Sequence, residues 1–258
     1  MADTITQPGL FEMMYSCRSM RRLSPRPVPE ALLLKLVEAG MHAPSAANAQ
    51  NWRFVVVRNR EVMASIAQPW RRGIAIMQEF ADRAPARAGE DLDARRRTMR
   101  AVVHLADHFE ETPAVICVCV RRDVIGESEA RRFAALRSVV RHLGLWRALR
   151  LAQRARRNAE QELWANAYTA AQNILLAARA SGLGAVLTMP QVLAPPGTYE
   201  RILGLPDDVR LAALIPVGYP LGRFGSVSRA APAQFVAWDR YEPAPPIDRP
   251  ESAGRPVG

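Results

Sequence analysis

The sequence has few residues of the kinds that build disulfide frameworks or metal sites. Its three cysteines include Cys117 and Cys119, which stand one residue apart inside an apolar run. This spacing suits neither a zinc site nor a redox pair, so we interpret both as buried small side chains. The four histidines are too scattered to suggest a metal cluster. We therefore expect no metal site.

Long apolar runs and targeting signals are also missing. No stretch approaches the roughly 18–20 apolar residues that a membrane helix needs, so we expect no membrane span. The start of the chain lacks the basic residues and apolar stretch of a secretory signal, which favours a cytoplasmic protein. No strand–GxGxxG–helix unit occurs, which argues against a Rossmann domain.

Apolar residues and arginine are abundant instead. Hydrophobic residues make up 49% of the 258 positions, enough for a sizeable core. We expect a single domain over residues 1–242 and a proline-rich tail over residues 243–258. The net charge is +10, and Lys35 is the only lysine. Arginine suits phosphate better than lysine does, because its guanidinium is planar and always charged.

Hydrophobic periodicity and turn residues predict the order of the secondary-structure elements. Helices are expected at residues 29–41, about 93–110, 160–180 and 196–204, and strands at residues 52–57, 114–120, 184–187 and 211–217. Helices and strands alternate irregularly, and several connections are long. This pattern favours an α+β fold, with helices packed on a central sheet.

The helix at residues 160–180 has the clearest periodicity. Its predicted apolar stripe consists of Trp164, Tyr168, Ala171, Leu175 and Ala178. A helix of this length runs roughly 30 Å, which suits the spine of a domain or a dimer. Ser181 and Gly182 follow it and are typical of a helix C-terminus.

The segment that precedes this helix, residues 121–157, is strongly basic. It holds eleven arginines against three acidic residues. Apolar residues recur within it at helical spacing, so we predict one or two basic amphipathic helices. These arginines could favour NADPH or an anionic acceptor, and a solvated basic face explains them equally well.

Two segments near the N-terminus suit a ligand that is both anionic and flat. Residues 17–23 place three arginines and a serine within five positions, namely Arg18, Ser19, Arg21 and Arg22. Fixed positive charge and several hydrogen-bond donors are what a phosphate needs. Residues 43–54 combine small side chains with the polar Ser45, Asn48 and Gln50, directly ahead of a predicted strand. Alone, the first segment would be better explained as a solvated basic turn. The second could be an ordinary helix-to-strand loop, but three polar amides directly ahead of a buried strand argue against that explanation.

Two further segments follow the long helix. Residues 181–190 contain a Gly-Leu-Gly sequence, and residues 215–229 carry a strand into a glycine-rich turn with Arg223 and Arg229. Alone, these segments are equally well explained as a helix cap and a strand exit.

In their order and spacing, the four segments resemble the nitroreductase family. That family has an Arg-Ser-x-Arg segment, an Ala-Pro-Ser loop containing Asn-x-Gln-Pro-Trp-x-Phe, a long helix ending in Gly-Leu-Gly, and a Gly-Tyr-Pro turn followed by an arginine. The chain matches all four over about residues 11–240, with a gap at residues 121–157. The resemblance implies a nitroreductase-like α+β fold with a mostly antiparallel sheet. It also implies a homodimer whose long helices meet at the interface.

The resemblance further implies FMN at that interface, touched by both chains, with NAD(P)H as electron donor and a small aromatic acceptor. Since the flavin carries the chemistry, no catalytic side chain is expected. The family's binding positions carry over to Arg18, Ser19, and Arg21 or Arg22 for the phosphate and ribityl chain, with Arg229 and Arg223 completing the phosphate site. Those near the ring are Pro44, Ser45, Ala46, Asn48 and Gln50, with the backbone of Leu187, Thr188 and Met189 near the flavin N5.

The chain departs from the family pattern at two places. Asn51 replaces the usual proline before Trp52, and Ala46-Ala47 replaces a pair containing serine or glycine. We expect flavin binding to survive, with a change in the loop. The basic insertion at residues 121–157 falls where family members vary, so we expect it to influence the choice of acceptor.

Three alternatives to nitro reduction are open. The same fold serves flavin-dependent quinone or enone reductases, dehalogenases and dehydrogenases, and the motifs do not distinguish among the acceptors. A second alternative is a protein that binds FMN without turnover. A third is a nucleic-acid or membrane-surface binder built on the basic segment. We expect no nucleic-acid partner, because this third alternative leaves the four motifs unexplained.

Overall fold

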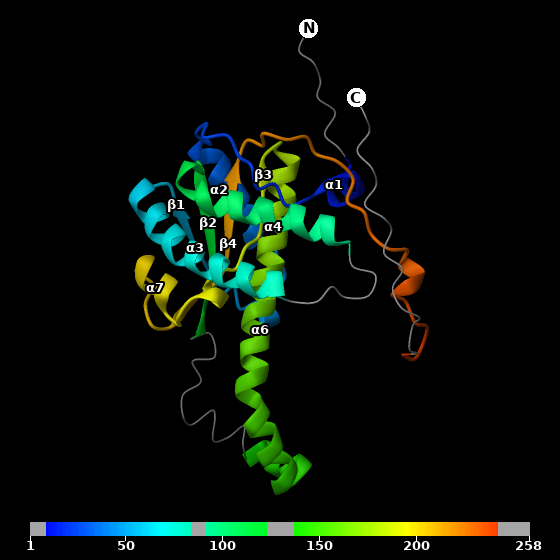
Figure 1. The fold of residues 1–258 in the computed structure, drawn as a ribbon. Coiled ribbons are helices and arrows are strands. Elements are labelled where there is room, and N and C mark those ends of the chain that lie inside the picture. The colour runs from blue at the N-terminus through cyan, green and yellow to red at the C-terminus, as the bar shows by residue number, and fades with distance from the viewer. Residues whose placement is uncertain (1–8, 84–90, 123–136, 242–258) are drawn as a thin grey trace.

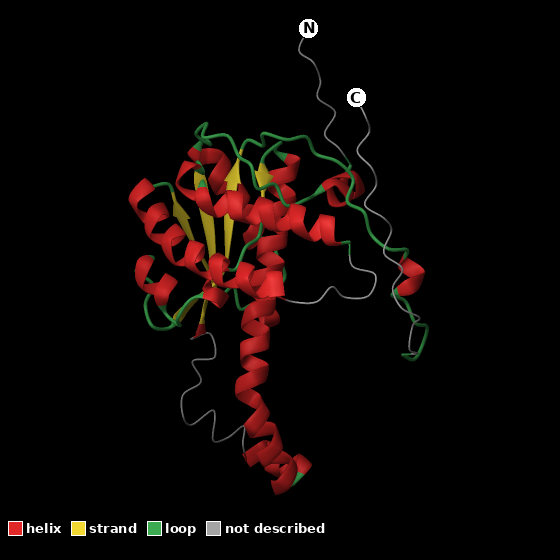
Figure 2. Cartoon of the chain, viewed as in Figure 1, coloured by secondary structure: helices red, strands yellow, loops and turns green. Residues whose placement is uncertain are grey.

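The computed structural model describes residues 9–83, 91–122 and 137–241, and in this part of the chain a sheet lies between helices (Figures 1 and 2). The helices are α1 (Leu10–Ser16), α2 (Glu30–Met41), α3 (Arg60–Arg83), α4 (Leu92–Asp107), α6 (Leu145–Ala180) and α7 (Thr198–Ile202). The strands are β1 (Trp52–Val57), β2 (Ala114–Arg121), β3 (Gly184–Ala185) and β4 (Val209–Gly218). Short 3₁₀ helices are η1 (Ala46–Asn48), η2 (Phe109–Glu111), η4 (Pro190–Leu193) and η5 (Pro232–Gln234). The predicted proline-rich tail at residues 243–258 lies outside the described residues.

The sheet has four strands in the order β1-β2-β4-β3, and every pairing is antiparallel. Its central strand β2 is buried along almost its whole length, because helices cover both faces. Val115, Cys117 and Cys119 face the core beneath α3 and α4, while Ile116 and Val118 face the core beneath α2 and α6. A strand buried on both faces requires the continuous apolar run seen in the sequence. The α+β prediction is therefore confirmed.

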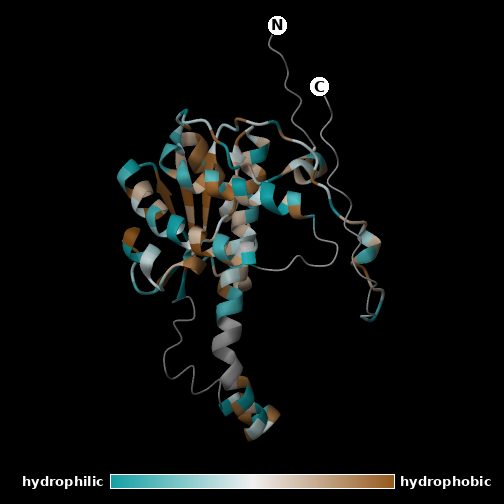
Figure 3. Ribbon diagram, viewed as in Figure 1, coloured by the Kyte–Doolittle hydropathy of each residue, from teal (hydrophilic) through white to brown (hydrophobic). Residues whose placement is uncertain are grey.

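Figure 3 shows that the strands are apolar and that the helices around them have mixed polarity. Cys117 and Cys119 are both fully buried and unpaired, as predicted. Burial raises the pKa of the Cys119 thiol to about 12, so it behaves as a small apolar side chain at neutral pH. Within the described residues, no three metal-binding side chains cluster, and no helix is long and apolar enough to span a membrane.

The long helix α6 differs from its prediction at its N-terminus. It begins at Leu145 rather than Glu160 and has 36 residues, which corresponds to about 54 Å. Figure 1 shows that its N-terminal part projects well beyond the sheet. Core periodicity could not reveal this part, because it has no sheet to pack on. Alanine, leucine, glutamine and arginine are strong helix formers, and they continue the helix outward.

The predicted apolar stripe of α6 was also partly wrong. The buried face consists mainly of small residues: Ala167, Ala170, Ala171, Ile174 and Ala178. Tyr168, predicted to lie on the stripe, is 38% exposed. Small side chains allow α2 to approach closely, since a Cβ atom on Gly40 would lie only 2.9 Å from Cγ1 of Ile174. The buried face of α6 therefore carries small side chains that allow close helix packing, instead of large apolar ones.

The basic segment 121–157 is described only in part. Residues 137–143 are helical, and Gly144 adopts a left-handed φ of 78° before α6 begins. Predicted helical structure is thus present over 137–157, and the start of the segment continues β2 to Arg121. The remainder, residues 123–136, lies outside the described residues.

Two helices were not predicted. The helix α3 has 24 residues and contains Pro69, and α1 precedes the basic N-terminal segment. Other predicted elements are confirmed with small shifts at their ends: α2, β1 and β2 match closely, α4 ends at Asp107, and β4 extends over Val209–Gly218. The predicted strand at residues 184–187 forms ladder pairs only at Gly184 and Ala185.

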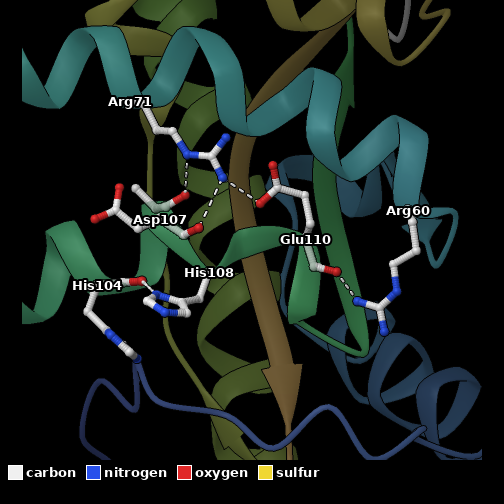
Figure 4. Close-up of polar contacts among 7 residues, drawn as sticks. Arg60, Arg71, His104, Asp107, His108 and Glu110 are labelled. Atoms are coloured by element: carbon white, nitrogen blue, oxygen red, sulfur yellow. Dashed lines mark hydrogen bonds and ion pairs between the residues drawn. The ribbon is translucent and has the colours of Figure 1, made fainter.

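An ion pair fastens α3 to the end of α4 (Figure 4). Arg71 on α3 pairs with Glu110 and donates to the carbonyl oxygens of Ala106 at 2.9 Å and Asp107 at 3.1 Å. Arg60, also on α3, donates to the carbonyl oxygens of Glu110 and Thr112. Partial burial acts to raise the pKa of Glu110, but the hydrogen bond from Arg71 opposes it, and the net shift is downward.

Glu110→Gln is expected to lower the free energy of unfolding at pH 7 by about 0.5–1 kcal/mol. A carboxyl whose folded pKa lies below its unfolded pKa stabilises the protein above the unfolded value, about 4.3, and loses this effect as the pH falls through the folded value. Urea unfolding should therefore show a smaller difference between wild type and variant at pH 3 than at pH 7. The control is Glu30→Gln, which removes the exposed pair with Arg58 and should have a smaller effect. An equal difference at both pH values would contradict the prediction.

Candidate functional site

Three of the four sequence motifs lie side by side in the structure. The N-terminal segment runs between β3 and the turn that follows β4. Met20 donates its backbone N–H to the carbonyl of Ala185 at 3.0 Å, and Leu221 donates to the carbonyl of Arg22 at 3.0 Å. Leu23 also forms an isolated β-bridge with Pro220. Residues 18–24, 184–187 and 219–225 therefore lie side by side, and the exposed residues among them form one surface.

Two glycines make this close approach possible. A Cβ atom on Gly184 would lie 2.9 Å from Cβ of Met20 and 3.1 Å from Cβ of Pro220. A Cβ atom on Gly218 would lie 2.8 Å from Cγ of Pro113. Side chains at these positions would force the three segments apart, which gives the Gly-Leu-Gly and Gly-Tyr-Pro sequences a physical role at this site.

The predicted cations lie along this surface with different surroundings. Arg18 approaches Gly225, whose Cβ position would be 3.9 Å from the guanidinium. Arg21 is half-buried, and burial lowers its pKa. Arg22 is exposed and lies near α4, where burial, His108 and Arg22 together lower the pKa of His104.

The remaining predicted contacts at this end are exposed: Ser19, Arg223 and Arg229. Arg229 donates to the carbonyl of Ser228 at 2.8 Å, and its segment is attached to α1 through the bond from the Val227 amide to the Tyr15 carbonyl at 2.9 Å. Among the residues that the structure describes, no ion pair involves any of the five predicted arginines. The surface therefore carries several cations without an acidic partner.

The loop between α2 and β1 forms the second part of the candidate site. Pro44, Ala46, Asn48 and Gln50 are exposed, and Ser45 is half-buried. The Ser45 hydroxyl accepts a hydrogen bond from the Gln50 amide at 3.1 Å, and the Gln50 side chain donates to Asn48 Oδ1 at 3.1 Å. These bonds fold the loop back on itself and leave its small side chains at the surface.

The backbone of this loop is strained. Ala47, Asn48 and Gln50 have φ values of 50°, 54° and 46°, in the left-handed region that few residues other than glycine adopt. Such conformations persist only where surrounding contacts hold them, and they cluster at ligand sites. The sequence did not reveal this strain, because none of the three residues is glycine.

Buried amides attach the loop to α6. Asn166 on α6 accepts a hydrogen bond from the Ala46 amide at 3.0 Å and donates to Asn51 Oδ1 at 3.0 Å. Thr169, one turn later, donates to the carbonyl of Pro44 at 3.2 Å. Sequence reasoning missed Asn166 and Thr169. The only available signal was that both are polar residues in an otherwise alanine-rich helix.

The third motif supplies backbone groups beside the N-terminal segment. Thr188 pairs with Leu214 of β4 through two bonds of 2.9 Å, which use both its N–H and its carbonyl. In such a bridge, the peptide groups of the neighbouring residues point the other way. The amides of Leu187 and Met189 therefore face away from β4, and the amide of Thr188 is not available to a ligand. Tyr168 on α6 donates to Sδ of Met189 at 3.2 Å.

The two parts of the candidate site lie at different positions along α6. The loop contacts α6 at Asn166 and Thr169, whereas the N-terminal segment contacts it near Arg179, which donates to the Ser16 hydroxyl at 3.0 Å. Ten residues of helix between Thr169 and Arg179 span about 15 Å. The structure of one chain thus brings the first, third and fourth motifs together and holds the second motif farther along the same helix.

Comparison with known proteins shows what this arrangement is similar to. The profile described as the Nitroreductase family matches residues 15–219 of the chain. An NADH dehydrogenase from Thermus thermophilus is 31% identical over 223 residues, which cover 86% of this chain and 91% of that relative.

Solved structures share the fold. An iodotyrosine deiodinase bound to FMN and 3-iodo-L-tyrosine has a TM-score of 0.62 and 21% identity, covering 90% of this chain and 100% of the other. The NADPH:FMN oxidoreductase from Vibrio harveyi, complexed with NAD+, has a TM-score of 0.58 and 16% identity, covering 92% and 79%.

Proposed function

The chain belongs to the nitroreductase family, and from this premise we propose that it is an FMN-dependent oxidoreductase. It takes electrons from NAD(P)H and delivers them to a nitroaromatic, a quinone or a related small acceptor by ping-pong kinetics. The observation that carries the proposal is the surface of Arg18, Arg21, Arg22 and Arg223, which form no ion pair with the described residues and lie near the backbone of residues 184–187. We further propose that the protein is a cytoplasmic homodimer.

The residues present fit FMN. Its phosphate needs cations that are not already neutralised, and the described ion pairs leave Arg18, Arg21 and Arg22 unused. Burial of Arg21 without an acidic partner is unfavourable, as its lowered pKa indicates, and a bound phosphate would offset that cost. The flat ring needs small side chains, and Pro44, Ser45 and Ala46 supply them at the surface.

When bound, FMN supplies the redox chemistry at its N5 atom. The chain binds and orients it. Arg18, Ser19, Arg21 and Arg22 would hold the phosphate and ribityl chain, with Arg223 and Arg229 contributing from the segment after β4. The backbone amides of Leu187 and Met189 would serve as donors to the ring. Asn48 and Gln50 supply polar groups at the edge of the loop.

The homodimer accounts for the separation of the two parts of the site along α6. A second chain would bring its loop at residues 44–50 to the arginine surface of the first. The helix α1, which packs beside α6, also supports a subunit interface. Four of its apolar side chains are 43–67% exposed, namely Leu10, Phe11, Met14 and Tyr15. An apolar group of this kind on a surface marks an interaction site.

Dehalogenation is the second candidate function. It is favoured by the structural likeness to the iodotyrosine deiodinase, which covers the whole of that chain. The same arginine surface and the same loop would serve either acceptor. The difference would lie in residues that contact the acceptor, and the basic insertion at 121–157 is the segment we propose for that role.

The purified protein is expected to be yellow and to release FMN, rather than FAD, on denaturation. Anaerobic NADH or NADPH should bleach the flavin absorbance, and a nitroaromatic or quinone should restore it. An iodinated phenol should restore it if dehalogenation is the reaction. Mass spectrometry identifies the released flavin, and the visible absorbance spectrum follows its reduction and reoxidation. A colourless protein that cannot be reconstituted with FMN would contradict the proposed function.

A further inference from the structure

A single buried residue of α6 forms hydrogen bonds to both ends of the loop between α2 and β1. Asn166 is 5% exposed and uses both of its side-chain groups. Its oxygen accepts from the Ala46 amide at 3.0 Å, and its nitrogen donates to Asn51 Oδ1 at 3.0 Å. Ala46 opens the strained turn and Asn51 closes it. Asn166 thus attaches both ends of the turn to α6, and Thr169 adds a bond to the carbonyl of Pro44.

Asn51 extends the connection to the sheet. It is 3% exposed, and its side-chain nitrogen donates to the carbonyl of Arg121 at 3.4 Å. The backbone groups of the same two residues are also joined, by a bond of 2.8 Å from the Arg121 amide to the Asn51 carbonyl. The end of β2, the start of β1 and the middle of α6 therefore meet at one pair of amides.

This pair matters because it restrains a loop whose backbone is unusual, although two backbone bonds, from Asn48 to Ser45 and from Ala49 to Ala46, also act within the loop. Three of its residues have left-handed φ values without being glycine, and such a backbone relaxes unless other contacts restrain it. The bonds within the loop, from Gln50 to Ser45 and to Asn48, are exposed and compete with water. The bond from Asn166 to Asn51 is buried and the bond from the Ala46 amide to Asn166 is partly buried, and an amide left unsatisfied away from water is costly.

We propose that Asn166 and Asn51 are positioning residues, which hold loop 44–50 in the shape that receives the flavin ring without themselves touching the ligand. In this chain, the amide pair replaces the rigidity that a proline before Trp52 would supply. A proline has no side chain that could accept from Asn166. The inference rests on the proposed function for the identity of the ligand, but the restraint on the loop exists without it.

The central test compares Asn166→Leu with Asn173→Leu. The first leaves the Ala46 amide and Asn51 without their partner. The second is a matched control, because Asn173 is also an α6 amide that donates to another element, the carbonyl of Ala39 on α2 at 3.1 Å. It makes no hydrogen bond to the loop in the described residues. Asn166→Leu removes two interelement bonds and Asn173→Leu removes one, so a purely structural role predicts a loss of stability in both and no effect specific to the loop.

Two readouts separate positioning from stability. In the FMN-free protein, hydrogen exchange of the backbone amides of residues 45–50 should accelerate about tenfold in Asn166→Leu and remain unchanged in Asn173→Leu. The FMN dissociation constant, measured by quenching of flavin fluorescence, should rise about tenfold only in Asn166→Leu, as expected when the hydrogen bonds that hold the loop are lost. Asn166→Asp retains the acceptor for Ala46 and should fall between the two.

Each outcome decides the proposal. Equal exchange and equal affinity in the two leucine variants would overturn it, as would an unchanged loop in Asn166→Leu. If Asn166→Leu does not fold, Asn166→Asp and Asn51→Ala answer the same question. If the wild-type protein binds no FMN, the proposed function fails, and the exchange experiment still tests the restraint by itself.

Discussion

Replacing Arg21 by alanine is expected to weaken FMN binding by about a hundredfold, the loss of one charge-assisted phosphate contact of about 1.5–3 kcal/mol. Arg21 is half-buried, its pKa is lowered by burial, and it has no acidic partner in the described ion pairs. A cation that is partly shielded from water and has no ion pair among the described residues can interact strongly with a bound anion. Titration of the FMN-free protein with FMN measures the change directly.

The control for Arg21→Ala is Arg58→Ala. It removes the same charge from an exposed ion pair with Glu30, away from the arginine surface, and should leave FMN affinity unchanged. Arg229→Ala tests the other side of the phosphate site and should weaken binding roughly tenfold to a hundredfold, the range for one such contact. Affinity unchanged by Arg21→Ala would show that the phosphate lies elsewhere.

The second large effect concerns stability. Gly184→Val is expected to lower the free energy of unfolding by about 1–3 kcal/mol, because a side chain there overpacks a site that has no room. Its first carbon alone would lie 2.9 Å from Cβ of Met20, 3.0 Å from Cδ2 of Leu23 and 3.1 Å from Cβ of Pro220. Since these neighbours belong to the N-terminal segment and the turn after β4, FMN affinity should fall together with stability.

Gly222→Ala is the control for this substitution. Gly222 lies in the turn after β4, and a Cβ atom there would make only an ordinary contact of 3.7 Å with Cε of Met20. Thermal or urea unfolding should show little change for this variant. If the Gly184→Val protein were as stable as wild type, the three segments could move apart without cost. The close packing at Gly184 would then contribute nothing to the free energy of unfolding.

The elements predicted well are those whose signal is local. The strand β1 was predicted with both of its ends, and α2 within one residue, because proline, an apolar face and a following loop mark them. In β2, Cys117 and Cys119 were predicted to be buried small side chains, and both are fully buried, whereas the apolar run of β1 suggested burial on both faces and the interior of that strand is only partly buried. In each case the relevant pattern lies within about a dozen residues.

Elements whose limits depend on distant partners were predicted poorly. The first fifteen residues of α6 lie beyond the sheet, so no core pattern marked them. The helix α3 contains Pro69 and packs its Gly73 against Leu193, where a Cβ atom would lie only 2.5 Å from that side chain. That contact joins residues far apart in the sequence, and nothing near Gly73 indicates it.

By itself, the sequence determined the family, the α+β class and the residue types that suit a flavin phosphate, since motif order and arginine content are properties of the chain alone. Only the tertiary structure decided how these parts meet. It gathered three motifs around Gly184 and Gly218, directed the Thr188 amide to β4, and joined Ala46 to Asn166 across 120 residues of sequence. Such contacts depend on which surfaces pack together, and packing is a property of the whole fold.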